Sequence, residues 1–173
     1  MRYSKQSGFS LIELLITTSI LIVLISIGVP GLQTFIKNNR LLAQTNLMMV
    51  SIKTARSEAM TQRNPVTVCM SADGAACGGS WSDGHIAFLD NDSDGTVDGG
   101  ETVLIYNQMN ATSMNITFSG GNFMTFDRRG RAVGSSGALV FCDDRGSDYA
   151  RGITIQPIGR SKTTGGTLVC PSS

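Results

Sequence analysis

Carboxylate side chains recur at alternate positions in the segment 90–101. Its spacing, D-x-D-x-D-G-x5-E, is that of a loop that binds Ca²⁺ through oxygen ligands. Crowded carboxylates repel one another, and a bound cation would relieve that repulsion. The candidate calcium ligands are Asp90, Asp92, Asp94, Thr96 and Glu101. Because the flanking residues have the pattern of strands and not of helices, a solvated acidic hairpin loop without metal is the alternative. No other cofactor is expected.

The four cysteines indicate disulfides and not a zinc site. Cys69, Cys77, Cys142 and Cys170 contain no C-x-x-C pair, and the chain has a single histidine, His85. An even number of cysteines in an exported chain predicts disulfides, and four cysteines allow three pairings. We favour the pairing of near neighbours in sequence, Cys69 with Cys77 and Cys142 with Cys170.

Catalytic signatures are missing from the sequence. It has no G-x-S-x-G motif and no P-loop, and the single His85 offers no pairing with a nucleophile. Asp143 and Asp144 are adjacent in sequence, so their side chains point apart and a solvated turn is expected. We therefore expect a protein that is not an enzyme.

The charges are distributed unevenly, although the net charge of +1 by itself indicates no partner. Seven acids and no Lys or Arg lie in the segment 72–101. The segment from residue 151 onward has three bases and no acid, the bases being Arg151, Arg160 and Lys162. The first region repels anions, and the second attracts them.

The N-terminal segment predicts a membrane span that is kept after processing. Residues 1–8 are polar and carry Arg2 and Lys5, whereas residues 9–29 are almost wholly apolar. About 20 helical residues at ~1.5 Å per residue match a hydrocarbon core of ~30 Å, and basic residues before the span place the leader in the cytoplasm. The chain continues past Pro30 into another helical pattern, which favours cleavage before the span, between Gly8 and Phe9.

Glu13 is the one charged residue inside this span. A carboxylate in hydrocarbon costs roughly 2.5–3.5 kcal/mol on insertion scales. In one interpretation Glu13 forms an S-x-x-E capping box with Ser10. In the other, it pairs with the new amino terminus of Phe9, in its own or a neighbouring chain, and sets the register between subunits.

The remaining pattern predicts an α+β protein. Apolar residues at helical spacing continue through residues 31–64, and Asn64-Pro65 ends the helix. Short runs separated by Gly, Asn, Asp and Ser then predict an antiparallel β-rich domain over residues 65–173 that packs on the helix. The expected strands are 66–70, 85–89, 102–106, 115–118, 123–126, 138–142, 152–156 and 167–170.

The motif Gly8-Phe9-Ser10-Leu11-Ile12-Glu13 resembles the signal of type IV pilins and type II secretion pseudopilins. The order of A-R-S-E-A at 55–59, P-V-T-V-C at 65–69 and G-R at 130–131 resembles FimT/GspH-type minor pilins and pseudopilins. The resemblance implies the pilin fold, with a leader (1–8), a membrane and filament-core helix (9–30), an amphipathic helix (31–64) and a globular domain (65–173). It also implies cleavage by a prepilin peptidase and N-methylation of Phe9.

The resemblance further implies partners and a location. The partners are major and minor pilins, and the protein crosses a bacterial inner membrane once, with its globular domain in the periplasm or, in a pilus, outside the cell. FimT-type proteins that act in natural transformation bind DNA through a C-terminal G-R-x-R motif. Arg160 and Lys162 hold its two basic positions here, with lysine replacing arginine at the second, and Arg151 is the expected neighbour. The alternative function is that of a GspH-like minor pseudopilin, or of a pilus-priming subunit without DNA binding. The basic segment Arg128-Arg129-Gly130-Arg131 is expected to be a turn.

Overall fold

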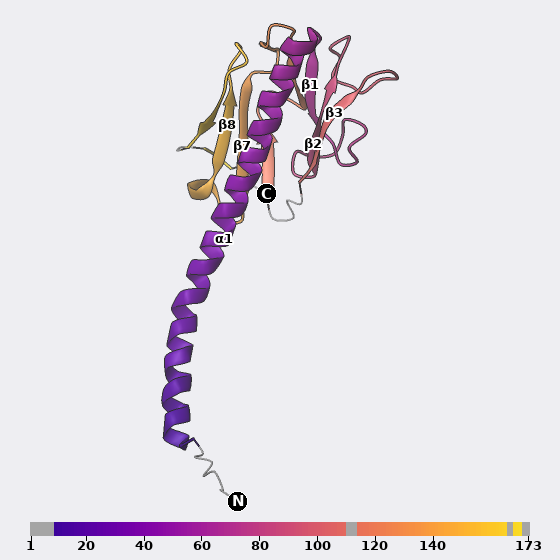
Figure 1. Cartoon of the computed structure of the whole chain (residues 1–173). Helices are drawn as coiled ribbons and strands as arrows, with labels where there is room; N and C mark the ends of the chain where they lie inside the picture. Colours follow the sequence, from indigo (N-terminus) through magenta and orange to yellow (C-terminus); the bar gives the residue numbers. More distant parts are fainter. Residues whose placement is uncertain (1–8, 110–113, 166–167, 171–173) are drawn as a thin grey trace, which may run out of the picture. The chain divides into compact units, whose positions relative to one another are not determined.

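The computed structural model describes residues 9–109, 114–165 and 168–170, so Gly8 and the rest of the predicted leader lie outside the described residues. Helix α1 runs from Leu11 to Gln62 (Figure 1). Pro30 lies inside the helix, so the two predicted segments 9–30 and 31–64 form one continuous element. The helix ends where Arg63 adopts a positive φ of 53° and Pro65 follows, because a proline cannot continue the hydrogen-bond ladder.

The chain divides into two compact units, one up to Asn39 and one from Arg40 onward. In the first unit the apolar side chains of α1 are exposed, and the helix is long and apolar enough to cross a membrane. Its hydroxyl groups bond back to the helix: Thr17 donates to the carbonyl of Glu13 at 2.9 Å, and Ser19 to that of Leu15 at 2.7 Å. From Thr17 onward the apolar part of the helix therefore satisfies its own hydroxyl groups, as a lipid environment requires.

The second unit holds two antiparallel sheets. The first has the order β3-β2-β1-β5-β6, and the second the order β4-β7-β8-β9. Their strands are β1 (Val66–Met70), β2 (Gly84–Leu89), β3 (Val103–Gln108), β4 (Met114–Phe118), β5 (Phe123–Phe126), β6 (Ala132–Val133), β7 (Gly137–Asp143), β8 (Arg151–Ile155) and β9 (Ser161–Thr164), with a 3-10 turn at Ser147–Tyr149. The predicted α+β class is confirmed.

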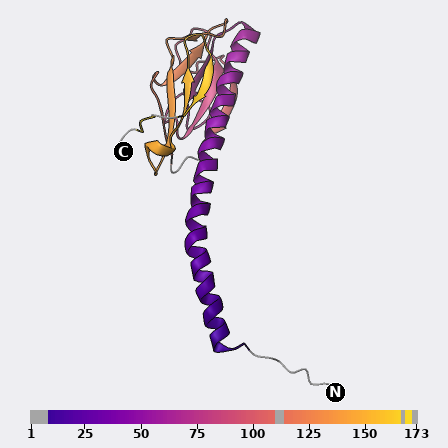
Figure 2. The same ribbon diagram turned by 90° about the vertical axis from the view of Figure 1, so that its left-hand side faces the viewer.

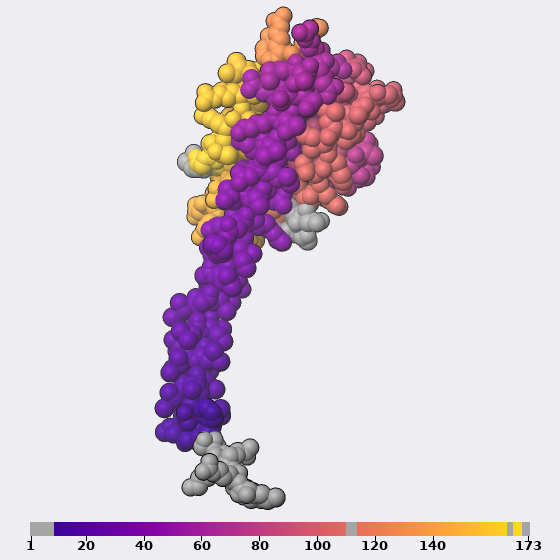
Figure 3. All heavy atoms as spheres, in the orientation of Figure 1, coloured from indigo at the N-terminus to yellow at the C-terminus, as the bar shows by residue number. Residues whose placement is uncertain are grey.

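The C-terminal part of α1 lies across both sheets, as Figures 1 and 2 show from two sides and Figure 3 shows in space-filling form. Its apolar residues recur at the spacing of one helix face and are almost fully buried. They form one core with both sheets; the helical members include Leu41, Met48, Ile52, Ala55 and Ala59, and the strand members include Val66, Val68, Phe126, Leu139, Phe141, Ile153 and Ile155.

A polar cluster is buried between α1 and the first sheet. The Ser51 hydroxyl lies 2.7 Å from Nε2 of His85, and the Asn107 amide donates to the same hydroxyl at 2.9 Å. Burial lowers the pKa of His85 to about 4. His85 is therefore neutral and ties β2 to the helix, which is a structural position.

The predicted strand 167–170 is wrong. Residues 168–170 form no strand, whereas the last strand, β9, lies at Ser161–Thr164 and pairs with β8. The turn at Pro157 and Gly159 reverses the chain direction. The residues that pair with β8 are therefore those that directly follow this turn. The two-residue strand β6 was not predicted, because so short a segment has no recognisable alternation.

Candidate functional site

Arg160 and Lys162 lie on the β8–β9 hairpin. Lys162 is directly opposite Thr154, and the amide of Gln156 donates to the carbonyl oxygen of Arg160 at 2.9 Å. Ile153 and Ile155 face the core, so alternation places Thr154 and its partner Lys162 on the outer face of the sheet. Both basic side chains are exposed, and Arg160 directly precedes the strand that carries Lys162.

Arg151 is not brought together with this pair. It begins β8 and is paired with Phe141, a core residue, so it alternates to the face that also carries Ile153. Lys162 is paired with Thr154, three residues further along β8, which is roughly 10 Å at the rise of a strand. The Arg151 side chain is exposed at the end of the sheet but lies on the other face.

The segment Asp127–Arg131 is the predicted turn, and it also touches the β8–β9 hairpin. Within the turn, the Gly130 amide donates to the Asp127 carbonyl at 2.7 Å, and the Asp127 carboxylate accepts from the Arg131 guanidinium at 2.7 Å. The Ala132 amide donates to the carbonyl of Pro157 at 3.0 Å. Gly159 has a φ of +77°, and a Cβ there would lie 1.8 Å from the Gly130 oxygen. The backbones of the two turns are therefore in direct contact.

Arg56 holds these two turns from the helix. Its Nε donates to the carbonyl of Gly130 at 2.8 Å, and a second guanidinium nitrogen donates to the carbonyl of Ile158 at 3.4 Å. Next to them is a hollow of about 650 Å³ whose charged lining is four arginines and one aspartate. We call this region the basic end and define it by Arg56, Arg63, Arg128, Arg129 and Arg131, together with Arg160 and Lys162 of the adjoining hairpin.

Sequence reasoning missed the part that Arg56 and Arg63 play in this region. Arg56 lies near the end of α1, and its two partners are 74 and 102 residues away in the chain; Arg63 follows the last residue of the helix and lines the hollow. The sequence contained no signal for the contact, apart from the concentration of arginine in each of the three segments.

Comparisons with known proteins identify the family of the chain. The family described as "Type II transport protein GspH" matches residues 44–159, which is most of the globular unit. The chain belongs to the GspH family. A second match, to the prokaryotic N-terminal methylation motif, covers residues 3–29. None of the curated proteins compared matches the chain.

Two crystal structures of another protein have a fold similar to that of this GspH-family chain. Both are of the type IV minor pilin FimU of Pseudomonas aeruginosa, with TM-scores of 0.63 and 0.58 at 20% and 18% identity. They cover 80% and 76% of this chain and 98% of the FimU chain in each case. These structures show that the chain has the pilin fold. The two family matches make it a member of the type IV pilin and pseudopilin superfamily, with an apolar N-terminal helix that fits a membrane anchor.

Glu13 of the GspH-family chain lies in the first turns of α1, with an exposed side chain. The helix starts at Leu11, so Ser10 is at the position of an N-cap. Within the described part of the chain, neither the Ser10 hydroxyl nor the Glu13 carboxylate forms a hydrogen bond, so the capping box is not made. The carboxylate is available to a partner outside its own helix.

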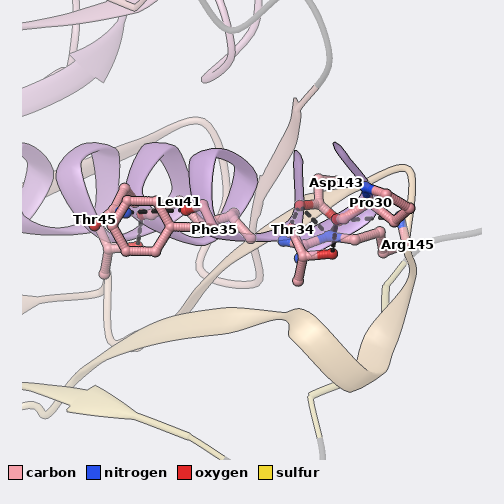
Figure 4. A network of polar contacts seen from close by, with 8 residues as sticks. Pro30, Thr34, Phe35, Leu41, Thr45, Asp143 and Arg145 are labelled. Carbon is pink, nitrogen blue, oxygen red and sulfur yellow. Dashed lines mark hydrogen bonds and ion pairs between the residues drawn. The ribbon is translucent and has the colours of Figure 1, made fainter. Parts of the chain in front are cut away.

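The GspH-family chain carries two disulfides, with the pairing expected from the sequence. Cys69 is joined to Cys77, and Cys142 to Cys170. The second bond ties the C-terminal tail to β7, and the Leu168 side chain lies against Gly152 of β8. Nearby, the Arg145 guanidinium pairs with Asp143 at 2.6 Å (Figure 4) and lies over the Tyr149 ring.

The acidic loop of the GspH-family chain connects β2 to β3. Asp90, Asp92 and Asp94 each place a carboxylate oxygen within 4.8 Å of the others. The other two predicted ligands are engaged within the loop. Both Glu101 oxygens accept backbone amide hydrogen bonds, from Asn91 at 2.8 Å and Asp98 at 3.1 Å, and the Thr96 hydroxyl donates to Asp94 at 2.7 Å.

Proposed function

We propose that this protein is a minor subunit of a type IV pilus and that its basic end binds the phosphates of DNA outside the cell. The observation that carries the proposal is the contact between the hairpin of Arg160 and Lys162 and the turn of Arg128 and Arg129. Guanidinium groups pair with phosphate through two parallel hydrogen bonds, and cations from two turns can follow one backbone. Such binding is independent of sequence and weakens with salt.

The N-terminal segment supports incorporation into a filament. We propose that a prepilin peptidase cuts between Gly8 and Phe9, that Phe9 is N-methylated, and that Glu13 pairs with its amine in the same or a neighbouring subunit. Before assembly the protein would cross the inner membrane once, with its N-terminus in the cytoplasm and its globular unit in the periplasm. After assembly, the basic end would lie on the outside of the cell.

The DNA-binding part is tested with the full-length protein in detergent. Fluorescence anisotropy of a labelled duplex is measured between about 50 and 200 mM salt, where each phosphate contact contributes about −0.9 to the slope of log K against log salt. The variant Arg160→Gln/Lys162→Gln should weaken binding and flatten the slope by about 2. Arg128→Gln/Arg129→Gln should act in the same way.

Arg151→Gln is the matched control, because this arginine is exposed on the opposite face of the same sheet. It should leave affinity and slope close to those of the unaltered protein. Binding that is unchanged in both double variants, or equally weakened by Arg151→Gln, would show that the basic end is not the DNA site.

The family match favours a second candidate, a minor pseudopilin of a type II secretion system. Deletion of the gene distinguishes the two when transformation, piliation and protein secretion are measured side by side. The pilus proposal predicts loss of transformation with secretion intact. A defect confined to secretion would establish the pseudopilin function instead.

A further inference from the structure

We infer that the loop between β2 and β3 binds one calcium ion through the carboxylates of Asp90, Asp92 and Asp94. An oxygen of each lies within 4.8 Å of the others, close enough for one cation to contact all three. Asp92 and Asp94 are exposed, whereas Asp90 is fully buried, so the group is anchored at one side and open at the other.

Asp90 is the observation that separates this group from an ordinary acidic loop. Its Oδ2 accepts from the Thr67 hydroxyl at 2.6 Å and from the Gly95 amide at 3.2 Å. Its Oδ1 is also buried but has no hydrogen-bond partner. Among the described residues no cationic side chain forms an ion pair with Asp90. Burial of an anionic oxygen without a partner costs free energy, and a bound cation would supply the missing partner.

The surrounding chain holds the loop in a fixed shape. Gly95 has a φ of +79°, and a Cβ there would lie 2.6 Å from the Phe123 ring. Val97 packs with Phe123 against the small core cluster of Cys69, Ile86 and Phe88. Glu101 closes the loop through its two amide hydrogen bonds, so we assign it as a positioning residue and not as a ligand.

The chemistry of the donors selects the ion. All three side chains offer hard oxygen ligands, with no nitrogen or thiolate among them, which suits Ca²⁺ and not zinc or copper. An open, solvent-exposed side allows water and a loop carbonyl to complete the six to eight ligands that Ca²⁺ takes. Mg²⁺ demands a stricter octahedron and should bind more weakly. Extracellular calcium modules bind with Kd values of about 10⁻⁴–10⁻³ M, and we expect the same range here.

Isothermal titration of the full-length protein in detergent with CaCl₂ tests the site, together with melting curves in Ca²⁺ and in EGTA. We expect about one ion per chain and a melting temperature that rises by several degrees in Ca²⁺. Asp92→Asn/Asp94→Asn should lower the affinity at least tenfold and abolish the rise. Both residues are exposed, so this variant should still fold in EGTA.

Asp98→Asn is the matched control, because Asp98 is exposed in the same loop but outside the group of three. It should bind Ca²⁺ as the unaltered protein does. Absence of both heat and a melting shift would overturn the inference. So would an equal loss in Asp98→Asn and in the double variant, since that result would indicate diffuse attraction to an acidic surface.

Discussion

Arg56 donates a hydrogen bond from its Nε to the carbonyl oxygen of Gly130, 2.8 Å away. The donor lies near the end of α1 and the acceptor in the basic turn that precedes β6. The same guanidinium also reaches the carbonyl of Ile158, so one side chain joins the helix to both basic turns. Arg56 thus uses its donors to hold the backbones of the two turns that carry Arg128, Arg129 and Arg160.

Replacement of Arg56 by glutamine should therefore affect stability and DNA binding together. Two carbonyl oxygens would lose a charged donor, which predicts a loss of about 1–2 kcal/mol in the free energy of unfolding by denaturant. DNA affinity should fall as well. Lys53→Gln removes the same charge from an exposed position of α1 and should leave stability unchanged. Equal stability of both variants would show that the Arg56 contacts contribute nothing.

Gly159 tests the contact between the two basic turns directly. Alanine at this position would place its Cβ 1.8 Å from the Gly130 oxygen and would hold a positive φ of 77°, so the turns must separate. We expect a loss of more than about 2 kcal/mol in unfolding free energy. Gly134→Ala has a similar φ of +65° with no atom within 4 Å, and should cost only about 1 kcal/mol. Similar losses in both variants would contradict the steric argument.

Protonation of His85 should lower the stability of the protein in mild acid. Its pKa is about 4 in the folded protein, lowered by burial from an ordinary value of 6.5. Between these pH values the unfolded chain binds a proton that the folded protein excludes, so stability is complete above pH 6.5 and falls toward pH 4. The contribution lost is up to about 3 kcal/mol. The free energy of unfolding, measured across this window, should depend less on pH in His85→Gln than in the unaltered protein. An identical pH dependence in the variant would refute the assignment.

Glu13 and Gly8 should have separable effects. Gly8→Ala should leave the leader attached, which mass spectrometry of the purified protein would reveal. Glu13→Ala should be cut normally but should be missing from sheared pili, because the amine of Phe9 would have no carboxylate to meet in the apolar filament core. Recovery of Glu13→Ala in pili at the level of the unaltered protein would exclude a role of this residue in assembly.

The bond between Cys142 and Cys170 should stabilise the C-terminal tail and, through it, the domain. Its cysteines are 28 residues apart, and closing a loop of this length stabilises by about 3.5 kcal/mol in the chain-entropy account. Cys170→Ser and the double variant Cys142→Ser/Cys170→Ser should lose similar amounts from the linkage, because either change removes the same bond. Chemical denaturation without reductant measures this loss, because the Cys69–Cys77 bond then stays intact in every variant. A denaturation midpoint of Cys170→Ser equal to that of the unaltered protein would argue against it.

Local patterns predicted the elements well where the reason for them is local. The apolar run from Phe9, the helical spacing up to Gln62 and the strand Val66–Met70 follow from side-chain periodicity, and the structure confirms them. The strand expected at 167–170 was wrong, because β8 pairs with the residues that directly follow its turn, whatever their residue types. Polar residues such as Lys162 do not give the alternating apolar pattern from which a strand is predicted.

By itself the sequence determined the apolar helix with its single acid and the acidic loop, since each depends on spacing within one segment. It favoured one disulfide pairing among three, and the structure confirms that pairing. The tertiary structure alone determined which charged residues lie close together. It brought Arg56 to turns 74 and 102 residues away and put Arg151 on the other face of its sheet. It also buried Asp90 where no cation of the described part of the chain pairs with it. The physical reason is that hydrogen-bond register and core packing fix these distances, and neither is encoded by neighbours along the chain.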